Sequence, residues 1–142
     1  MSVKKTFVPP AAVRRNAKLG LKLHKSGFKG GTQTGWNRAR QLAEKESISL
    51  STLATMRAWF ARHGPDAANN GTSYPGYRKW IEDGSPTVPD NSNRDAYRGA
   101  VSWLIWGGDA AYKWLKSDKV RTALQQTYPN RKSASPRNNL VK

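Results

Sequence analysis

Apolar residues along this chain recur at helical spacing rather than in the strict alternation of a strand. After Pro10, the residues Val13, Ala17 and Leu21 fall on one face of a predicted helix over 11–25, and basic residues occupy its other faces. Proline is tolerated in the first turn of a helix, so Pro10 fits its beginning. No alternating β-branched run is present, and we therefore expect no strands.

Turn-forming residues divide the rest of the chain into further predicted helices. Gly64 and Pro65 end one of them, and two glycines precede Asp109, which we expect to cap another. Residues 64–93 are rich in Gly, Pro, Asn, Asp and Ser, and they predict a loop with a short helical insert near 77–81. The remaining helical patterns cover about 34–43, 49–63, 93–106, 109–116 and 118–128.

These patterns predict an all-α fold, a compact bundle of about five or six short helices with basic flexible termini. Residues 1–9 are expected to form a basic arm, residues 10–128 the helical domain with 64–93 as its loop insert, and residues 129–142 a basic tail that is disordered until bound. The expected core consists of Trp36, Leu42, Leu53, Met56, Trp59, Phe60, Trp103, Trp106 and Trp114.

The stretch 40–57 has the residue spacing of a helix-turn-helix. A small residue, Ala43, ends the first predicted helix, Ile48 lies in the turn, and two apolar residues follow at inward positions of the second helix. In this interpretation Thr52 and Arg57 face a DNA groove, and only Arg57 can make a strong guanine contact. The alternative interpretation is an ordinary helical hairpin.

Charge changes this picture of a small helical protein. Of the 142 residues, 25 are Lys or Arg and 9 are Asp or Glu, which gives a formal net charge of +16. The first acidic residue is Glu44, and ten Lys or Arg residues precede it. No acidic residue follows Asp118. In a folded monomer with this net charge, the basic side chains repel one another unless a polyanion binds them. Nucleic-acid phosphates can do so, and their binding releases condensed counterions.

We therefore predict nucleic-acid binding through phosphate contacts, with low sequence specificity. A basic amphipathic helix can also bind an anionic membrane surface, but Gly20 and the lack of an aromatic anchor favour phosphates. Solubility alone is the alternative explanation of the charge. The sequence does not separate DNA from RNA, or single from double strands. The residues expected to contact nucleic acid are Arg14, Arg15, Lys18, Lys22, Lys29, Arg38, Arg40, Thr52, Arg57, Arg131 and Lys132.

Two further features each have a structural and a functional interpretation. The glycine-rich turn Gly30–Thr32 precedes a helix, where an anion can bind unpaired N–H groups, but a simple turn with positive φ explains it equally well. Asp109 is interpreted as a helix cap, with a functional role as the alternative.

Material for catalysis is scarce in this sequence. The absence of cysteine excludes disulfides and Cys-ligated zinc. The two histidines, His24 and His63, lie in no metal-ligand arrangement, and the acidic residues lack the spacing of a metal-dependent nuclease. We expect a protein that is not an enzyme and has no metal or cofactor. No apolar run approaches a membrane span, so we expect no membrane partner.

Several short motifs follow one another along residues 9–116. They are Gly30–Thr32, Gly35, Arg38–Arg40, Ser49, Thr52, Met56, Phe60–His63, Trp103, Trp106–Ala110 and Trp114. In this order they resemble a small tryptophan-rich domain family found in the genomes of tailed phages and large DNA viruses. The resemblance implies a viral context and no particular activity.

Charge and resemblance together predict a phage nucleic-acid-binding protein associated with DNA packaging or the virion, located in the host cytoplasm or the virion interior. One alternative is a minor capsid, cement or internal head protein whose basic face meets an acidic capsid surface. Six tryptophans would suit such an interface if they were exposed. A second alternative is a sequence-specific regulator that acts through the stretch 40–57.

Overall fold

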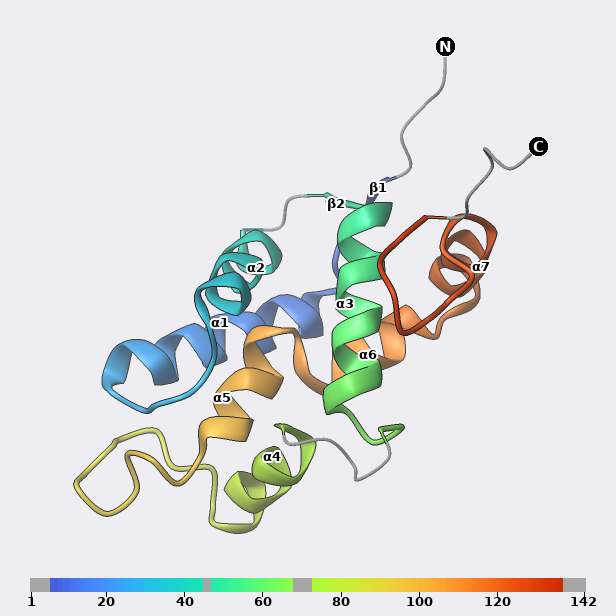
Figure 1. The fold of residues 1–142 in the computed structure, drawn as a ribbon. Helices are drawn as coiled ribbons and strands as arrows, with labels where there is room; N and C mark the ends of the chain where they lie inside the picture. The colour runs from blue at the N-terminus through green and yellow to red at the C-terminus, as the bar shows by residue number, and fades with distance from the viewer. Residues whose placement is uncertain (1–5, 45–46, 68–72, 137–142) are drawn as a thin grey trace.

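The computed structural model describes residues 6–44, 47–67 and 73–136. Within these residues the chain forms seven α-helices and one two-stranded sheet (Figure 1), which confirms the predicted all-α fold. The elements are β1 (Thr6–Phe7), α1 (Ala11–Ser26), α2 (Gln33–Ala43), β2 (Ile48–Ser49), α3 (Leu50–His63), α4 (Ser73–Glu82), α5 (Arg98–Ile105), α6 (Gly108–Leu115) and α7 (Asp118–Thr127).

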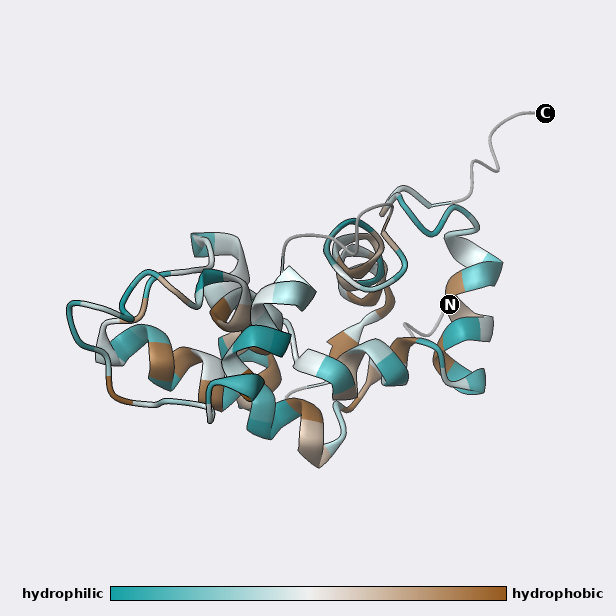
Figure 2. Ribbon diagram, turned by 90° about the horizontal axis from the view of Figure 1, so that it is seen from below, coloured by the Kyte–Doolittle hydropathy of each residue, from teal (hydrophilic) through white to brown (hydrophobic). Residues whose placement is uncertain are grey.

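The helices pack in two groups that α6 connects. In one group α1 packs against α2 and α5, and α5 packs against α4; in the other, α3 packs against α6 and α7. The helix α6 also contacts α1 and α5 (Figure 1). Hydrophobic and hydrophilic stretches alternate along the helices (Figure 2), as expected when each helix buries one face.

An aromatic cluster forms the centre of the core. Trp103 is completely buried, and the rings of Trp59 and Trp106 stack with their centroids 5.1 Å apart. Seven of the nine predicted core residues are buried, whereas Trp36 and Trp114 are half-buried at its edge. The buried seven are Leu42, Leu53, Met56, Trp59, Phe60, Trp103 and Trp106.

Asp109 supports this cluster instead of capping α6, so the predicted cap is wrong. The N-cap of α6 is Gly107, whose φ of 104° lies in the left-handed region. Asp109 is one position inside the helix, and its carboxylate accepts a 2.9 Å hydrogen bond from the indole nitrogen of Trp103. A buried indole N–H needs a partner, and Asp109 supplies it from the surface.

The expectation of no strands is also wrong, although the sheet is very small. Thr6 pairs with Ser49 and Phe7 with Ile48 in an antiparallel arrangement. Phe7 and Ile48 are both buried, so the end of the predicted basic arm is part of the domain. A pair of two-residue strands is too short to produce the alternation by which strands are recognised.

The packing of α2 and α3 does not correspond to a helix-turn-helix. That motif needs its second helix packed on its first, but α2 packs mainly on α1 and α5, and α3 mainly on α6 and α7. The apolar spacing was interpreted correctly as inward-facing, since Ile48, Leu53 and Met56 are buried, and Ser49 caps α3 as expected. These residues serve the common core rather than a two-helix unit.

The predicted loop insert is more regular than expected. Its helical part extends over the ten residues of α4, and the following helix, α5, begins at Arg98 rather than near residue 93. The carboxylate of Asp90 accepts hydrogen bonds from the backbone N–H groups of Ser92 and Asn93, which fixes the turn before α5.

Candidate nucleic-acid interface

The helix α1 separates its apolar and basic residues onto opposite faces. Val13, Ala17, Gly20 and Leu23 are buried against the core, with Leu23 in place of the expected Leu21, which is half-buried. The side opposite carries a row of exposed basic residues at helical spacing, which we call the cationic stripe. It consists of Arg15, Lys18, Lys22 and Lys25.

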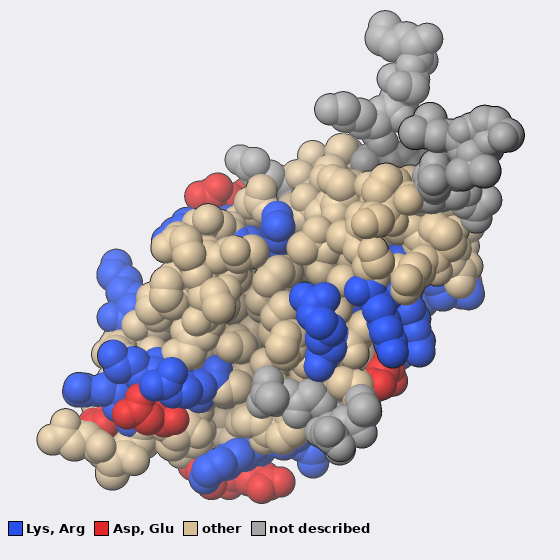
Figure 3. Space-filling model, in the orientation of Figure 1, with Lys and Arg blue, Asp and Glu red and all other residues tan. Residues whose placement is uncertain are grey.

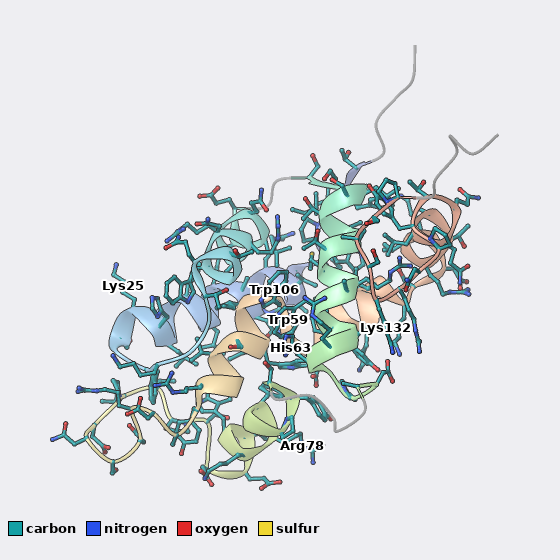
Figure 4. The ribbon with its side chains drawn as sticks, viewed as in Figure 1. Lys25, Trp59, His63, Arg78, Trp106 and Lys132 are labelled. Atoms are coloured by element: carbon teal, nitrogen blue, oxygen red, sulfur yellow. The ribbon has the colours of Figure 1, made fainter. Side chains whose placement is uncertain are left out.

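Among the residues that the structure describes, no carboxylate pairs with a member of this stripe. The helix α1 contains five Lys or Arg residues and no Asp or Glu. None of the ion pairs among the described residues involves a member of the stripe. From Arg15 to Lys25 the stripe extends about 15 Å along the helix axis, and Lys25 points away from the bundle near the end of α1 (Figure 4).

Close packing by Gly20 holds α1 in place behind the stripe. A Cβ atom at Gly20 would lie 2.7 Å from both the backbone nitrogen and the side chain of Ile105 in α5. Only glycine permits this approach of the two helices. The stripe is therefore mounted on a helix that is fixed against the core.

Arg14 and Lys29 lie apart from the cationic stripe. Arg14 is half-buried, and its guanidinium donates a 2.7 Å hydrogen bond to the carbonyl of Pro9, which fixes the entry of the chain into α1. Lys29 is exposed in the turn after α1, and its backbone N–H bonds to the carbonyl of Arg94. Its side chain is free to meet solvent anions, while that of Arg14 has a structural role.

A second, smaller group of basic residues lies on α2. Arg38 and Arg40 border a shallow depression that is also lined by Thr34, Asn37 and Gln41. Arg40 bonds to the side-chain oxygen of Asn37 at 2.7 Å. Arg38 lies over the ring of Trp106 at 5.9 Å, and its partial burial lowers the pKa of its guanidinium. Neither guanidinium pairs with a carboxylate among the described residues.

Thr52 and Arg57 of α3 both make hydrogen bonds within the protein. The hydroxyl of Thr52 is half-buried and accepts a 3.0 Å hydrogen bond from the capping Ser49. Arg57 donates to the backbone carbonyls of Tyr128 and Asn130. These bonds hold the chain that follows α7 and give the guanidinium of Arg57 a structural explanation, so base recognition by Arg57 stays a prediction that they do not favour.

Arg131 and Lys132 lie in the first part of the predicted tail, and this part contacts the domain. Together with Arg57 they line a cavity between α3, α6 and α7. The last predicted tail residues, 137–142, lie outside the described residues. Figure 3 shows Lys and Arg side chains gathered over this part of the molecule, and Figure 4 places Lys132 beside α6.

The glycine-rich turn before α2 has a structural explanation. Gly30 and Gly31 adopt φ values of 139° and 83°, which favour glycine. The backbone N–H of Gly31 bonds to the hydroxyl of Ser102, and that of Gly35 bonds to Thr32, the N-cap of α2. These N–H groups are therefore already occupied, which favours the simple-turn interpretation over an anion site.

Neither histidine lies in a metal-binding arrangement. His24 stacks on Trp36 with ring centroids 4.0 Å apart, and His63 lies 4.9 Å from Trp59. Burial and the nearby Arg62 lower the pKa of His63. The described part of the chain holds no group of three His, Cys, Asp or Glu residues placed to bind a metal ion. Among its helices, none has the length and apolar character needed to cross a membrane.

The sequence interpretation missed two parts of this basic surface. Lys25 continues the stripe seven positions after Lys18, so the helical spacing already contained the signal. Arg121 and Lys116 border the cavity with Arg57, and this grouping depends on tertiary packing alone.

Compared with known proteins, the chain matches no protein-family model, no curated protein and no solved structure, so the resemblance to a viral family stays a prediction.

Proposed function

We propose that this protein binds nucleic acid through the phosphate backbone, with the cationic stripe of α1 as its principal contact. The observation that carries the proposal is that no described carboxylate pairs with the stripe. Four exposed cations on one face of α1 have no carboxylate among the described residues to neutralise them. Phosphates would supply the missing negative charge and release counterions.

Binding of this kind has low sequence specificity. Three of the four stripe residues are lysines, which act on phosphates as flexible point charges and do not make the bidentate contacts that read guanine. Arg57, the residue best suited to such a contact, is bonded to backbone carbonyls. No observation thus favours a sequence-specific regulator.

The positions of the tryptophans give no support to the capsid-interface alternative. Trp59, Trp80, Trp103 and Trp106 are buried, and the other two are half-buried. Among the described residues the exposed large hydrophobic side chains are Val8, Ile81 and Val88, which are not the aromatic groups enriched at interface hot spots. We therefore propose nucleic acid as the polyanion and assign the protein no catalytic role. The motif resemblance is the basis for proposing a phage or other viral setting, in packaging or in the virion.

Fluorescence anisotropy with labelled duplex DNA, single-stranded DNA and RNA tests this proposal across a salt series. We expect binding to nucleic acid at about 50 mM salt, with log affinity falling linearly with log salt concentration. Polyglutamate serves as a model of an acidic protein surface. Binding to polyglutamate but to none of the three nucleic acids would contradict the proposal and favour the capsid alternative.

A further inference from the structure

After α7 the chain turns back toward α3 and borders a cavity. We call residues 128–136 the returning segment. In Figure 1 this segment passes from the end of α7 to a position between α7 and α3. Arg57 of α3 bonds to the carbonyls of Tyr128 and Asn130 and so attaches the segment to the domain. The cavity has a volume of about 340 Å³, and we call it the C-terminal cavity.

The walls of the C-terminal cavity combine apolar groups with positive charge. Apolar groups come from α3, α6 and the returning segment. Tyr112 also lines the cavity, and the ammonium group of Lys116 lies over its ring at 4.4 Å. Positive charge comes from all four surrounding segments. The apolar residues are Phe60, Ala61, Leu115 and Pro129, and the basic ones are Arg57, Lys116, Arg121, Arg131 and Lys132.

The negative charge in the cavity wall comes from Asp66, whose carboxylate already has partners. Among the described residues that line the wall, Asp66 is the one carboxylate, and it accepts hydrogen bonds from Lys116 at 2.9 Å and from Tyr112 at 2.7 Å. Arg121 pairs with Asp118 at 2.9 Å, outside the wall. Arg131 and Lys132 have no ion pair among the described residues.

Two guanidinium groups lie near one another in this wall. Burial lowers the pKa of Arg57, and the positive charge of Arg131 lowers it further. Since Arg57 is tied to backbone carbonyls, it does not move away from Arg131 without releasing the returning segment. An anion in the cavity would relieve this repulsion and link the segment more firmly to α3.

The size and walls of the cavity indicate an anion with an attached flat apolar group. Ligand pockets commonly have volumes of about 300–1,000 Å³, which is far more than an inorganic phosphate needs. Apolar walls beside a basic rim favour a nucleobase with its phosphate, because a base offers a flat face for apolar contact. A paired base in a duplex is not available for such a site.

We propose that the C-terminal cavity binds one nucleoside monophosphate unit, with the base against Ala61 and Pro129 and the phosphate on the basic rim formed by the returning segment. The inference deepens the proposed function and rests on it for the chemical class of ligand. The same chemistry is present in a free mononucleotide and in one unit of a single strand. The site gives the protein a single-strand contact that is separate from the cationic stripe.

Calorimetric titration of the full chain with adenosine 5′-monophosphate, ribose 5-phosphate and inorganic phosphate tests this site. We expect the nucleotide to bind at least about tenfold more tightly than either phosphate without a base. Equal affinity for the three would reduce the cavity to an unselective anion site and contradict the proposal. Absence of nucleotide binding would contradict it as well.

Matched variants distinguish the cavity from the stripe. Arg131→Gln with Lys132→Gln should weaken nucleotide binding about tenfold or more, because it removes the phosphate contacts. Lys18→Gln with Lys22→Gln removes the same charge from α1 and should leave nucleotide affinity unchanged while it weakens duplex binding. Equal loss in both variants would contradict a localised site.

Two more variants test the cavity without relying on loss of positive charge. Ala61→Phe fills the cavity from a half-buried position and should abolish nucleotide binding, with circular dichroism as the check on folding. Asp66→Asn removes the carboxylate that the described residues contribute to the wall and should raise nucleotide affinity.

An oligothymidine of eight nucleotides added to the same variants identifies the source of the ligand. If it competes with the mononucleotide, the site accepts a unit of a strand; if it does not, the site takes free nucleotide, and duplex binding by the stripe still tests the proposed function independently.

Discussion

The helix α1 and the segment 73–98 carry similar numbers of basic residues, but only those of the segment have acidic partners. The segment contains four Lys or Arg residues and four Asp or Glu residues, whereas α1 contains five of the first kind and none of the second. In the segment, Lys79 pairs with Asp83 at 2.8 Å and Arg98 with Asp95 at 3.0 Å. The comparison shows that a surface suited to an external anion is marked by basic residues without acidic partners, more than by the number of basic residues.

The lack of pairing on α1 has a cost in local stability. A Glu–Lys pair four residues apart stabilises a helix by about 0.2–0.5 kcal/mol, and an acidic residue in the first turn adds a favourable interaction with the helix dipole. The helix α1 uses neither device, and its N-cap, Pro10, makes no side-chain capping bond. Its stability comes from packing, which leaves its outer face free to carry charge alone.

The largest effect is expected from reversing the charge of the stripe. Lys18→Glu, Lys22→Glu and Lys25→Glu together should weaken duplex DNA binding by about 1,000-fold at 0.1 M salt, because each lost phosphate contact counts for close to one factor of ten there. Anisotropy titration measures the change.

The matched control reverses three charges in the segment 73–98. Arg78→Glu, Lys79→Glu and Arg98→Glu change the net charge by the same amount but should lower duplex affinity far less. A similar loss in both triple variants would show that net charge alone governs binding.

Glycine packing is a feature in which the two regions agree, and it predicts effects of moderate size. A Cβ at Gly20 would lie 2.7 Å from the backbone of Ile105, and a Cβ at Gly76 would lie 2.8 Å from the Cα of Gly99. Gly20→Ala and Gly76→Ala should each destabilise the protein by about 1–3 kcal/mol through overpacking. Urea denaturation of both variants measures this, and an unchanged midpoint for Gly20→Ala would mean that α1 is not held by the close approach.

A smaller effect is expected from giving α1 the kind of pair found in α4. Ala11→Glu places a carboxylate four residues before Arg15 and in the first turn of an exposed helix end. It should stabilise the protein by about 0.3–1 kcal/mol and weaken duplex binding a few fold. Thermal melting and anisotropy are measured on the same sample; Ala11→Gln controls for helix propensity. Gains in both stability and affinity would contradict the account of the stripe.

Acid should affect the segment 73–98 through Asp83, with an effect smaller than the others. Hydrogen bonds from Lys79 and Tyr97 lower the pKa of Asp83 in the folded protein. Its unfolded pKa is about 3.9, so its stabilising contribution is fully present above that pH and is lost as the pH falls through the lower folded pKa. A carboxylate NMR titration of Asp83 should show the lowered pKa, and Lys79→Gln should raise it. A value at or above that of an unstructured peptide would refute the pairing.

Local features of the fold were predictable from the sequence. The N-cap of α3 and the interruption between α5 and α6 follow from short-range rules, and Ser49 and the two glycines fulfil them. The pairing of Thr6 with Ser49 was not predictable, because it joins short segments far apart in the chain. The bond from Trp103 to Asp109 competes with capping, and local rules gave the wrong role for Asp109.

The two candidate binding surfaces differ in the same respect. The cationic stripe lies on one helix, so the spacing of its residues predicted most of it. The C-terminal cavity depends on the contact of Arg57 with Asn130, which are separated by 73 residues in the sequence. The spacing of 40–57 suggested a helix-turn-helix because buried positions in any two successive helices of a bundle can have that spacing.

The salt dependence of duplex binding tests the central claim most directly. We predict that Lys18→Gln, Lys22→Gln and Lys25→Gln together reduce the slope of log affinity against log salt concentration by about 2.7, which is the value for three lost phosphate contacts. The paired-region variant Arg78→Gln, Lys79→Gln and Arg98→Gln should keep the slope of the unaltered protein. An unchanged slope in the α1 variant would contradict the account, because it would mean that the unpaired stripe does not meet phosphates.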